Sequence, residues 1–573
     1  MRNYILVNAI SGSRSAQPRK HSAKSGFGLR IILLLSVGLA LAQTATAQNG
    51  ADVLSISAPA SVAPGATFTA TITMTNTGAN QWTTAGMYNL GSESPRNNSR
   101  WLAVWRIALP ADPINPGDTA AFTATFTAPT TPGVYTFTWS MVQDGVEWFG
   151  TLASTTIRVG NGRFTPGDLV VMQIVSTAID PPGINTAGTA IVLQDISLPS
   201  GATVFEVDLP ITGTNALITG GNPFSGSIDL STDGNYVVVG GYHTNAPYRP
   251  AGANVSVEAA PSPVPRAIGL VNSGGRYVLG ASTTPPAGFT GGTFRGVVSD
   301  GQNNFWGGAQ NNGIYYFGNN SAPVTINGAG AGAIRDMIMV NGRPCFSTSQ
   351  FPSTGNFGVV AFTSVAPTSP ETPTLIIDSG NAVTGGTGTA SPKGFCVNSN
   401  YTIAFVADLR GTSTGGGLYR YNGTGTGLAG SWTYQYTINN NLFPNGGAFQ
   451  EVVADFSGAD PIIYATAGAA AGGNNAGNTL VTAVDTGAAT TTFTTLATAP
   501  SGTSYRGLTF APKPISLSIT RSGTNVVIRW PGGGTLLSSS VVGGPYSPVA
   551  GSPTSPYTNA PTGTAQFYSV GAP

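Results

Sequence analysis

Hydrophobic and polar residues alternate along much of the chain. Residues 67–75 read TFTATITMT, which places Phe68, Ala70, Ile72 and Met74 on one side and threonines on the other. Residues 120–128 (AAFTATFTA) and 134–141 (VYTFTWSM) repeat this pattern. Alternation with a period of two is typical of strands in a sheet with one buried face. No long segment with helical periodicity follows residue 47, so we predict an all-β protein.

Residues 141–150, MVQDGVEWFG, hold two carboxylates beside two aromatic residues. Asp144-Gly145 lies between two predicted strands and indicates a two-residue hairpin turn. This turn would pair Met141 with Trp148, so we expect both side chains on the same face. Glu147 would then point to the other face while Asp144 lies in the turn. The sequence therefore predicts a hairpin here, and no acid/base pair.

The same region resembles a known domain family. The runs QWTTAGMYNLGS and WLAVWRIALP, followed by PGD, TPGVY and WFG turns, are similar to the four-tryptophan Ig-like domain of selective-autophagy receptors, which also occurs in exported bacterial proteins. The matching tryptophans are Trp82, Trp101, Trp139 and Trp148. The resemblance covers residues 52–160 and implies a β-sandwich that contacts proteins or other ligands, without catalysis. Alternatively, Trp101 and Trp105 could form an exposed sugar-stacking pair.

A weak repeat runs through residues 165–511. Short apolar strands followed by Asn, Asp or Gly turns begin near residues 226, 294, 334, 392, 449 and 505. Intervals of this size suit the four-stranded blades of a β-propeller, with six blades expected, or seven if residues 265–282 form their own blade. Residues 168–175 should pair with residues 505–510 and close the ring. The RG-starting strands and DG turns also loosely resemble propellers of exported bacterial proteins, which implies a fold and no reaction.

Basic side chains recur at the start of the predicted innermost strands. The basic residues at this position are Arg295, Arg335, Lys393 and Arg506, and the uncharged Gln450 takes the same position in the remaining strand. In a propeller these starts surround one mouth of the central channel, where several cations would favour an anionic ligand. The alternative is that each side chain packs between blades or pairs with a neighbouring acid, such as Asp336 or Glu451.

The motifs that could indicate catalysis lie in the wrong context. Residues 411–415 fit G-x-S-x-G, but a strand follows where that motif requires a helix. Residues 425–430 fit G-x-G-x-x-G and also lead into a strand. His243 is the single histidine after residue 47, and it lies in a turn. Asp229 and Asp233 could form a metal pair, but an Asp at position 233 is equally expected because Asp233-Gly234 is a turn sequence. We therefore expect no catalytic residues, metal or cofactor.

Acidic residues would be needed at the channel mouth if the chain were a carbohydrate lyase or hydrolase. The candidates there are Asp408, Asp455 and Glu451. Cys345 and Cys396 are the two cysteines, and they are either bridged or both free.

The first 47 residues have the features of a signal peptide. Basic residues precede the apolar run of residues 31–42, and Ala45-Thr46-Ala47 provides a cleavage site, although an uncleaved membrane anchor is an alternative. This segment holds six of the 24 basic residues and none of the 23 acidic ones, which leaves 18 basic against 23 acidic residues. Without basic clusters, nucleic-acid binding is disfavoured. We expect an exported protein, extracellular, on the outer cell surface or in the periplasm.

Residues 515–573 follow the proline-bearing link APKP and resemble the fibronectin-type-III-like modules that end many exported bacterial proteins. A segment of this size is small for independent stability, so we expect it to dock onto the propeller. Taken together, the sequence predicts a non-enzymatic binding or adhesion protein for protein or glycan ligands. A propeller enzyme acting on carbohydrate and a structural surface-layer component are the alternatives.

Overall fold

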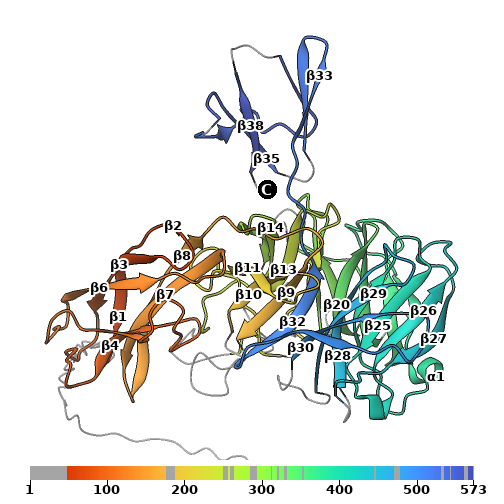
Figure 1. The fold of residues 1–573 in the computed structure, drawn as a ribbon, viewed down its shortest axis with the longest axis horizontal. Coiled ribbons are helices and arrows are strands. Elements are labelled where there is room, and N and C mark those ends of the chain that lie inside the picture. Colours follow the sequence, from red (N-terminus) through yellow and green to blue (C-terminus); the bar gives the residue numbers. More distant parts are fainter. Residues whose placement is uncertain are drawn as a thin grey trace, which may run out of the picture. The chain divides into compact units, whose positions relative to one another are not determined.

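The fold was analysed in a computed structural model of the chain. It describes residues 48–571 apart from 176–187, 223, 249–255, 259–263, 284–292, 311–312, 319–321, 328–331, 351–353, 444–446, 470–477, 531–533, 543 and 561–564. The predicted signal peptide therefore lies outside the described residues. Strands dominate, and the helices in the described part of the chain are α1 (Asn381–Thr384) and a 3-10 turn (Thr412–Thr414). The all-β prediction is confirmed (Figure 1).

Two sheets form an N-terminal sandwich around a common core. One sheet contains β1 (Ala51–Ser57), β3 (Thr67–Asn76) and β6 (Thr119–Thr127). The facing strands are β2 (Ser61–Val62), β4 (Tyr88–Ser92), β5 (Arg106–Ala108), β7 (Gly133–Gln143) and β8 (Glu147–Val159). The predicted faces of β3 and β6 meet in register, with Ile72 opposite Phe122, and both side chains are buried. Period-two alternation thus identified the buried face of each strand.

The β7–β8 hairpin differs from its predicted register by one residue. Gln143 pairs with Glu147, so the loop has three residues, and Gly145 adopts a positive φ of 80° there. Met141 consequently faces Phe149, while Trp148 lies opposite Val142 on the other face of the sheet. A shift of one residue turns a strand's side chains over, so the prediction that Trp148 shares the Met141 face is wrong.

The central region consists of six four-stranded antiparallel groups. Five are separate sheets: β12 (Ile228–Leu230), β13 (Tyr236–Tyr242), β14 (Arg266–Asn272) and β15 (Tyr277–Thr283); β16 (Phe294–Ser299), β17 (Phe305–Ala309), β18 (Gly313–Tyr316) and β19 (Val324–Thr325); β20 (Gly332–Val340), β21 (Arg343–Gln350), β22 (Thr354–Ala361) and β23 (Thr374–Asp378); β24 (Pro392–Val397), β25 (Ile403–Asp408), β26 (Leu418–Gly423) and β27 (Trp432–Ile438); and β28 (Gly447–Asp455), β29 (Ile462–Ala469), β30 (Thr479–Val484) and β31 (Thr494–Thr498). The sixth joins β9 (Leu169–Val175), β10 (Ile191–Ile196) and β11 (Thr203–Asp208) to β32 (Thr503–Phe510).

The sixth group unites the two ends of the central region. β32 pairs antiparallel with β9, from Thr503 opposite Val175 to Phe510 opposite Leu169, and the two strands lie side by side in Figure 1. The predicted pairing of residues 168–175 with residues 505–510 is therefore confirmed. The first strands of successive groups also contact one another, and β32 contacts both β28 and β12.

The sandwich and the central region share a sheet at their junction. β11 adds in parallel to β7, with Glu206 opposite Gly133 and Val207 opposite Val134. Beside this pairing, Arg100 of the sandwich forms ion pairs with Glu206 at 2.9 Å and with Asp208 at 2.5 Å. Thr136 of β7 is buried here, and its N–H and hydroxyl both donate to Asp208 at 2.9 Å.

The C-terminal segment has a small core of its own. β33 (Ser518–Ser522), β34 (Asn525–Arg529) and β37 (Tyr557–Asn559) form one sheet, and β35 (Thr535–Ser539), β36 (Ser547–Pro548) and β38 (Phe567–Gly571) form the other. Ile528, Trp530 and Leu536 are buried between them. Its docking onto the central region stays a prediction. Neither of the two short helical turns in the described ranges has the length or hydrophobicity of a transmembrane segment.

Candidate functional site

The five predicted channel-mouth residues occupy equivalent positions in their strands. Each lies at a register shift near the start of its strand: Arg295 in β16, Arg335 in β20, Lys393 in β24, Gln450 in β28 and Arg506 in β32. A β-bulge redirects a side chain out of the regular alternation. The recurring bulge places one polar residue at the same point of each of these strands.

Two of these cations pack on an aromatic ring of the chain itself. The guanidinium carbons of Arg295 and Arg335 lie 4.5 Å and 4.0 Å from the centre of the Phe224 ring. Burial, and then the neighbouring Arg335 charge, lower the pKa of Arg295 to about 9, while Glu258 opposes that shift. Phe224 and Glu258 belong to the connections before β12 and after β13, so residues outside the repeated strands set the surroundings of these cations.

Lys393 forms an ion pair with a neighbouring acid, which is the alternative to ligand binding that the sequence left open. Its ammonium group forms a buried ion pair with Glu451. The carboxyl groups of Glu451 and Asp336 share a hydrogen bond, and Ser227 donates to Asp336. Burial, and then the Asp336 carboxyl, raise the pKa of Glu451 well above its usual value. Ligand binding at this ring of polar residues stays a prediction.

The motifs set aside in the sequence have structural roles. Residues 412–414 form a 3-10 turn followed by β26, and both ring nitrogens of His243 contact neighbours, Ser282 at 2.8 Å and the Thr214 carbonyl at 3.0 Å. Asp408 pairs with Arg410 at 3.0 Å. In the described part of the chain, no group of His, Cys, Asp and Glu could hold a metal ion. Cys345 and Cys396 are both free and buried.

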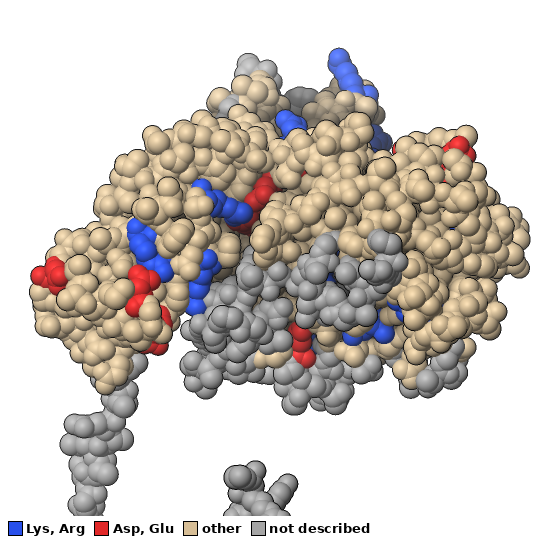
Figure 2. All heavy atoms as spheres, turned by 60° about the horizontal axis from the view of Figure 1, so that its bottom comes forward, with Lys and Arg blue, Asp and Glu red and all other residues tan. Residues whose placement is uncertain are grey.

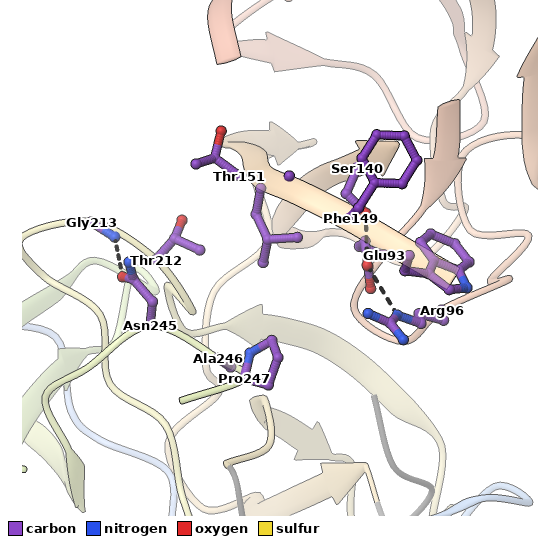
Figure 3. Close-up of a pocket in the computed structure, with 13 residues that line it drawn as sticks. Glu93, Arg96, Ser140, Phe149, Thr151, Thr212, Gly213, Asn245, Ala246 and Pro247 are labelled. Atoms are coloured by element: carbon purple, nitrogen blue, oxygen red, sulfur yellow. Dashed lines mark hydrogen bonds and ion pairs between the residues drawn. The ribbon is translucent and has the colours of Figure 1, made fainter. Parts of the chain in front are cut away.

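A cleft of about 430 Å³ opens where the sandwich meets the central region. We call it the junction cleft. It is lined by Glu93, Arg96, Ser140, Trp148, Phe149, Gly150, Thr151 and Leu152 of the sandwich and by Thr212, Gly213, Asn245, Ala246 and Pro247 of the central region. Figure 3 shows the Glu93–Arg96–Ser140 group and the Thr212–Gly213–Asn245 group on opposite sides of the open space.

Trp148 lines this cleft because of the three-residue hairpin loop. The half-buried indole rests on the backbone of Gly91, where an added Cβ atom would lie 2.6 Å from the ring. The guanidinium carbons of Arg96 and Arg106 both lie 4.8 Å from the ring centre. Arg106 is fixed in turn by an ion pair with Asp144 at 2.7 Å, which lowers the pKa of Asp144. The indole is therefore held in place before any ligand arrives.

The polar groups of the cleft are also held in place. On the sandwich side, Glu93 accepts hydrogen bonds from Ser140 at 2.8 Å and from Arg96 at 3.1 Å. On the other side, the amide oxygen of Asn245 accepts a hydrogen bond from the Gly213 N–H at 2.9 Å. Sequence reasoning missed this site because its two walls lie far apart in the chain. The run of Thr and Ser on the non-core face of β7 was the available signal.

The characteristic tryptophans divide between the core and the cleft. Trp82, Trp101 and Trp139 are buried in the sandwich core. The Trp101 indole donates to the Thr136 carbonyl at 3.0 Å, so the exposed Trp101–Trp105 pair considered from the sequence does not form. Trp105 by itself is 48% exposed.

One protein-family model matches the N-terminal sandwich. The family model for the Ig-like domain from next to BRCA1 gene matches residues 55–159. No curated protein matches the chain.

Solved structures show low overall likeness. A chain of the nidogen/laminin complex is 9% identical, with a TM-score of 0.36 over 60% of this chain and 99% of that one. A B. thetaiotaomicron protein described as the extracellular domain of a one-component system is 12% identical, with a TM-score of 0.29 over 64% of this chain and 38% of that one. The Swd1 β-propeller domain of Myceliophteria thermophila is 7% identical, with a TM-score of 0.28 over 54% and 94%. These scores are too low to carry an argument. The described residues thus form a nearly all-β structure, and residues 55–159 match an Ig-like domain.

Proposed function

We propose that this chain is an exported, non-enzymatic binding protein and that the junction cleft holds its ligand, a protein segment or a glycan. The observation that carries the proposal is Trp148, an indole fixed by neighbouring residues on the non-core face of its sheet and half-exposed in a cleft of about 430 Å³. Ligand sites are typically concave, of this size, and lined by aromatic surface with a few placed polar groups.

In this proposal the central region is a six-bladed β-propeller closed by β32 and β9. Six four-stranded groups and contacts between successive first strands support it, and β14 and β15 pair within the sheet of β12 and β13, which favours six blades over seven. In the same proposal, the sandwich is of the four-tryptophan type and the C-terminal module is fibronectin-III-like. Parallel pairing of β7 with β11 would hold the cleft walls at a fixed separation.

A carbohydrate-cleaving role is less well supported. The acids expected to serve it make other contacts: Asp408 pairs with Arg410, Asp455 accepts from the Ser457 N–H, and Glu451 is buried against Lys393. A general acid and base must reach the reacting bond from an accessible site.

The test compares two tryptophan variants on arrays of glycans and peptides. Trp148→Ala removes the aromatic wall of the cleft and should weaken binding of the selected ligand by about tenfold or more, as expected for a buried aromatic anchor. Trp105→Ala is the matched control, because Trp105 is exposed in the same sandwich and does not line the cleft. Equal effects of the two variants would contradict the proposed site.

A further inference from the structure

The charges of the junction cleft cancel within the cleft. Among the described residues that line it, Glu93 and Arg96 are the ones with charged side chains, and they form an ion pair at 3.1 Å. Both side chains are largely buried, with exposures of 1% and 12%. A charged ligand would therefore find no unneutralised charge of opposite sign among these two residues. It could bind one of them only by breaking the Glu93–Arg96 pair, which would leave the other charge buried and uncompensated.

The remaining lining groups suit hydroxyl-rich ligands. Thr151 and Thr212 offer hydroxyls, and Asn245 offers an amide whose orientation is set by the Gly213 N–H, whereas the Ser140 hydroxyl already donates to Glu93. The two threonine hydroxyls and the Asn245 amide can both donate and accept hydrogen bonds, which matches the hydroxyls of a sugar. They come from both walls of the cleft (Figure 3).

Apolar surface lies next to these polar groups. Trp148, Leu152 and Pro247 line the same cleft, and Trp148 is fixed in advance by Gly91 and by two arginines. Sugar rings present hydroxyls at their edges and C–H groups on their faces, so a site of this kind binds them with both surfaces. Preorganised side chains reduce the entropy lost on binding.

We infer that the junction cleft binds an uncharged saccharide and that the Glu93–Arg96 pair disfavours acidic sugars. This inference rests on the proposed function and specifies its ligand class. The size of the cleft, about 430 Å³, limits the ligand to a short oligosaccharide or the end of a longer chain.

The experiment uses the purified protein on an array of neutral and acidic glycans, followed by calorimetry with the best neutral oligosaccharide and with tetragalacturonate. Neutral binding should exceed tetragalacturonate binding by about tenfold or more, because the carboxylates of the acidic sugar would lose water in a cleft whose own charges already cancel. Asn245→Ala should weaken neutral binding about fivefold or more through the lost hydrogen bonds. Asn400→Ala, an exposed asparagine in a turn outside the cleft, should leave it unchanged.

Glu93→Gln supplies the charge-specific readout. It removes one negative charge from the cleft, so tetragalacturonate binding should rise about tenfold, which a purely structural role for Glu93 would not produce. Acidic glycans or peptides that bind the wild-type cleft and lose affinity in Asn245→Ala would overturn the inference and leave the proposed function standing. If no ligand depends on Trp148, both fail.

Discussion

Asp195, on β10, places a carboxyl group in the protein interior. The residue is fully buried, and its partner is the Thr165 N–H at 2.9 Å. Burial, with a smaller effect of Asp168, raises the pKa of Asp195 to about 7. In an unfolded chain the pKa is about 4, so the folded state keeps this proton over a range in which the unfolded state has lost it. The contribution of Asp195 to stability is therefore present at low pH and is lost as the pH rises through about 7.

Asp195→Asn tests this linkage. An amide keeps an acceptor for the Thr165 N–H but cannot ionise, so the variant should lose the part of the stability decline that wild type shows between about pH 4 and about pH 7. Urea denaturation across this range measures it. Asp460→Asn, at an exposed turn, is the control and should follow wild type. The same pH slope in Asp195→Asn and wild type would refute the assignment.

At the residue scale, the alternating pattern located most core side chains of the sandwich. Phe137, Trp139 and Met141 are all buried, as their spacing predicted. Trp148 was placed on the wrong face because Asp144-Gly145 fits both a two-residue and a three-residue loop. Local sequence does not distinguish these loops, yet their difference decides whether the indole enters the core or the cleft.

At the scale of elements, the junction depends on pairing between distant strands. β7 and β11 are brought together by a short parallel ladder and by Arg100, whose side chain is 24% exposed and contacts Glu206 and Asp208. The Asp208 carboxylate also accepts from the Thr136 N–H at 2.9 Å. No local pattern predicts this contact, since the strands belong to regions with independent periodicity.

Arg100→Ala should destabilise the fold by about 2–4 kcal/mol, because it leaves two largely buried carboxylates without their cation. Chemical denaturation gives the free energy of unfolding. Arg276→Ala removes an exposed arginine and should change that energy by less than about 0.5 kcal/mol. A loss in Arg100→Ala no larger than in this control would show that the ion pairs do not stabilise the junction.

For the residues at the bulged strand starts, the sequence predicted the positions but did not predict the surroundings. Recurring positions for Arg295, Arg335 and Arg506 could be read from the repeat, and the register shifts confirm that they are equivalent. The neighbours of these arginines could not be predicted, because Phe224 and Glu258 lie in connections outside the repeat.

At the scale of the whole molecule, few charges cover the surface, as Figure 2 shows for one face, and the uncharged composition predicted this. Pairing between the first and last strands of the central region was also predictable, since β9, β10 and β11 lacked a fourth member in the sequence repeat. The position of the cleft was not, because it exists only once sandwich and central region meet.

Two truncated chains test the importance of this closing pair. A chain ending at residue 500 lacks β32, exposes the edge of β9 and should lose cooperative thermal unfolding of the central region. A chain ending at residue 513 keeps β32 and loses only the C-terminal module. Because that module has a core of its own, the central region of this chain should still unfold cooperatively. Circular dichroism melting separates the two. Cooperative unfolding of the shorter chain would contradict a closed ring.

The most direct measurement is a crystal structure of the protein with the tightest-binding neutral oligosaccharide. We predict sugar density in the junction cleft, with a ring against Trp148 and a hydroxyl hydrogen-bonded to Asn245. A sugar bound at another surface while the cleft stays empty would contradict the proposed site.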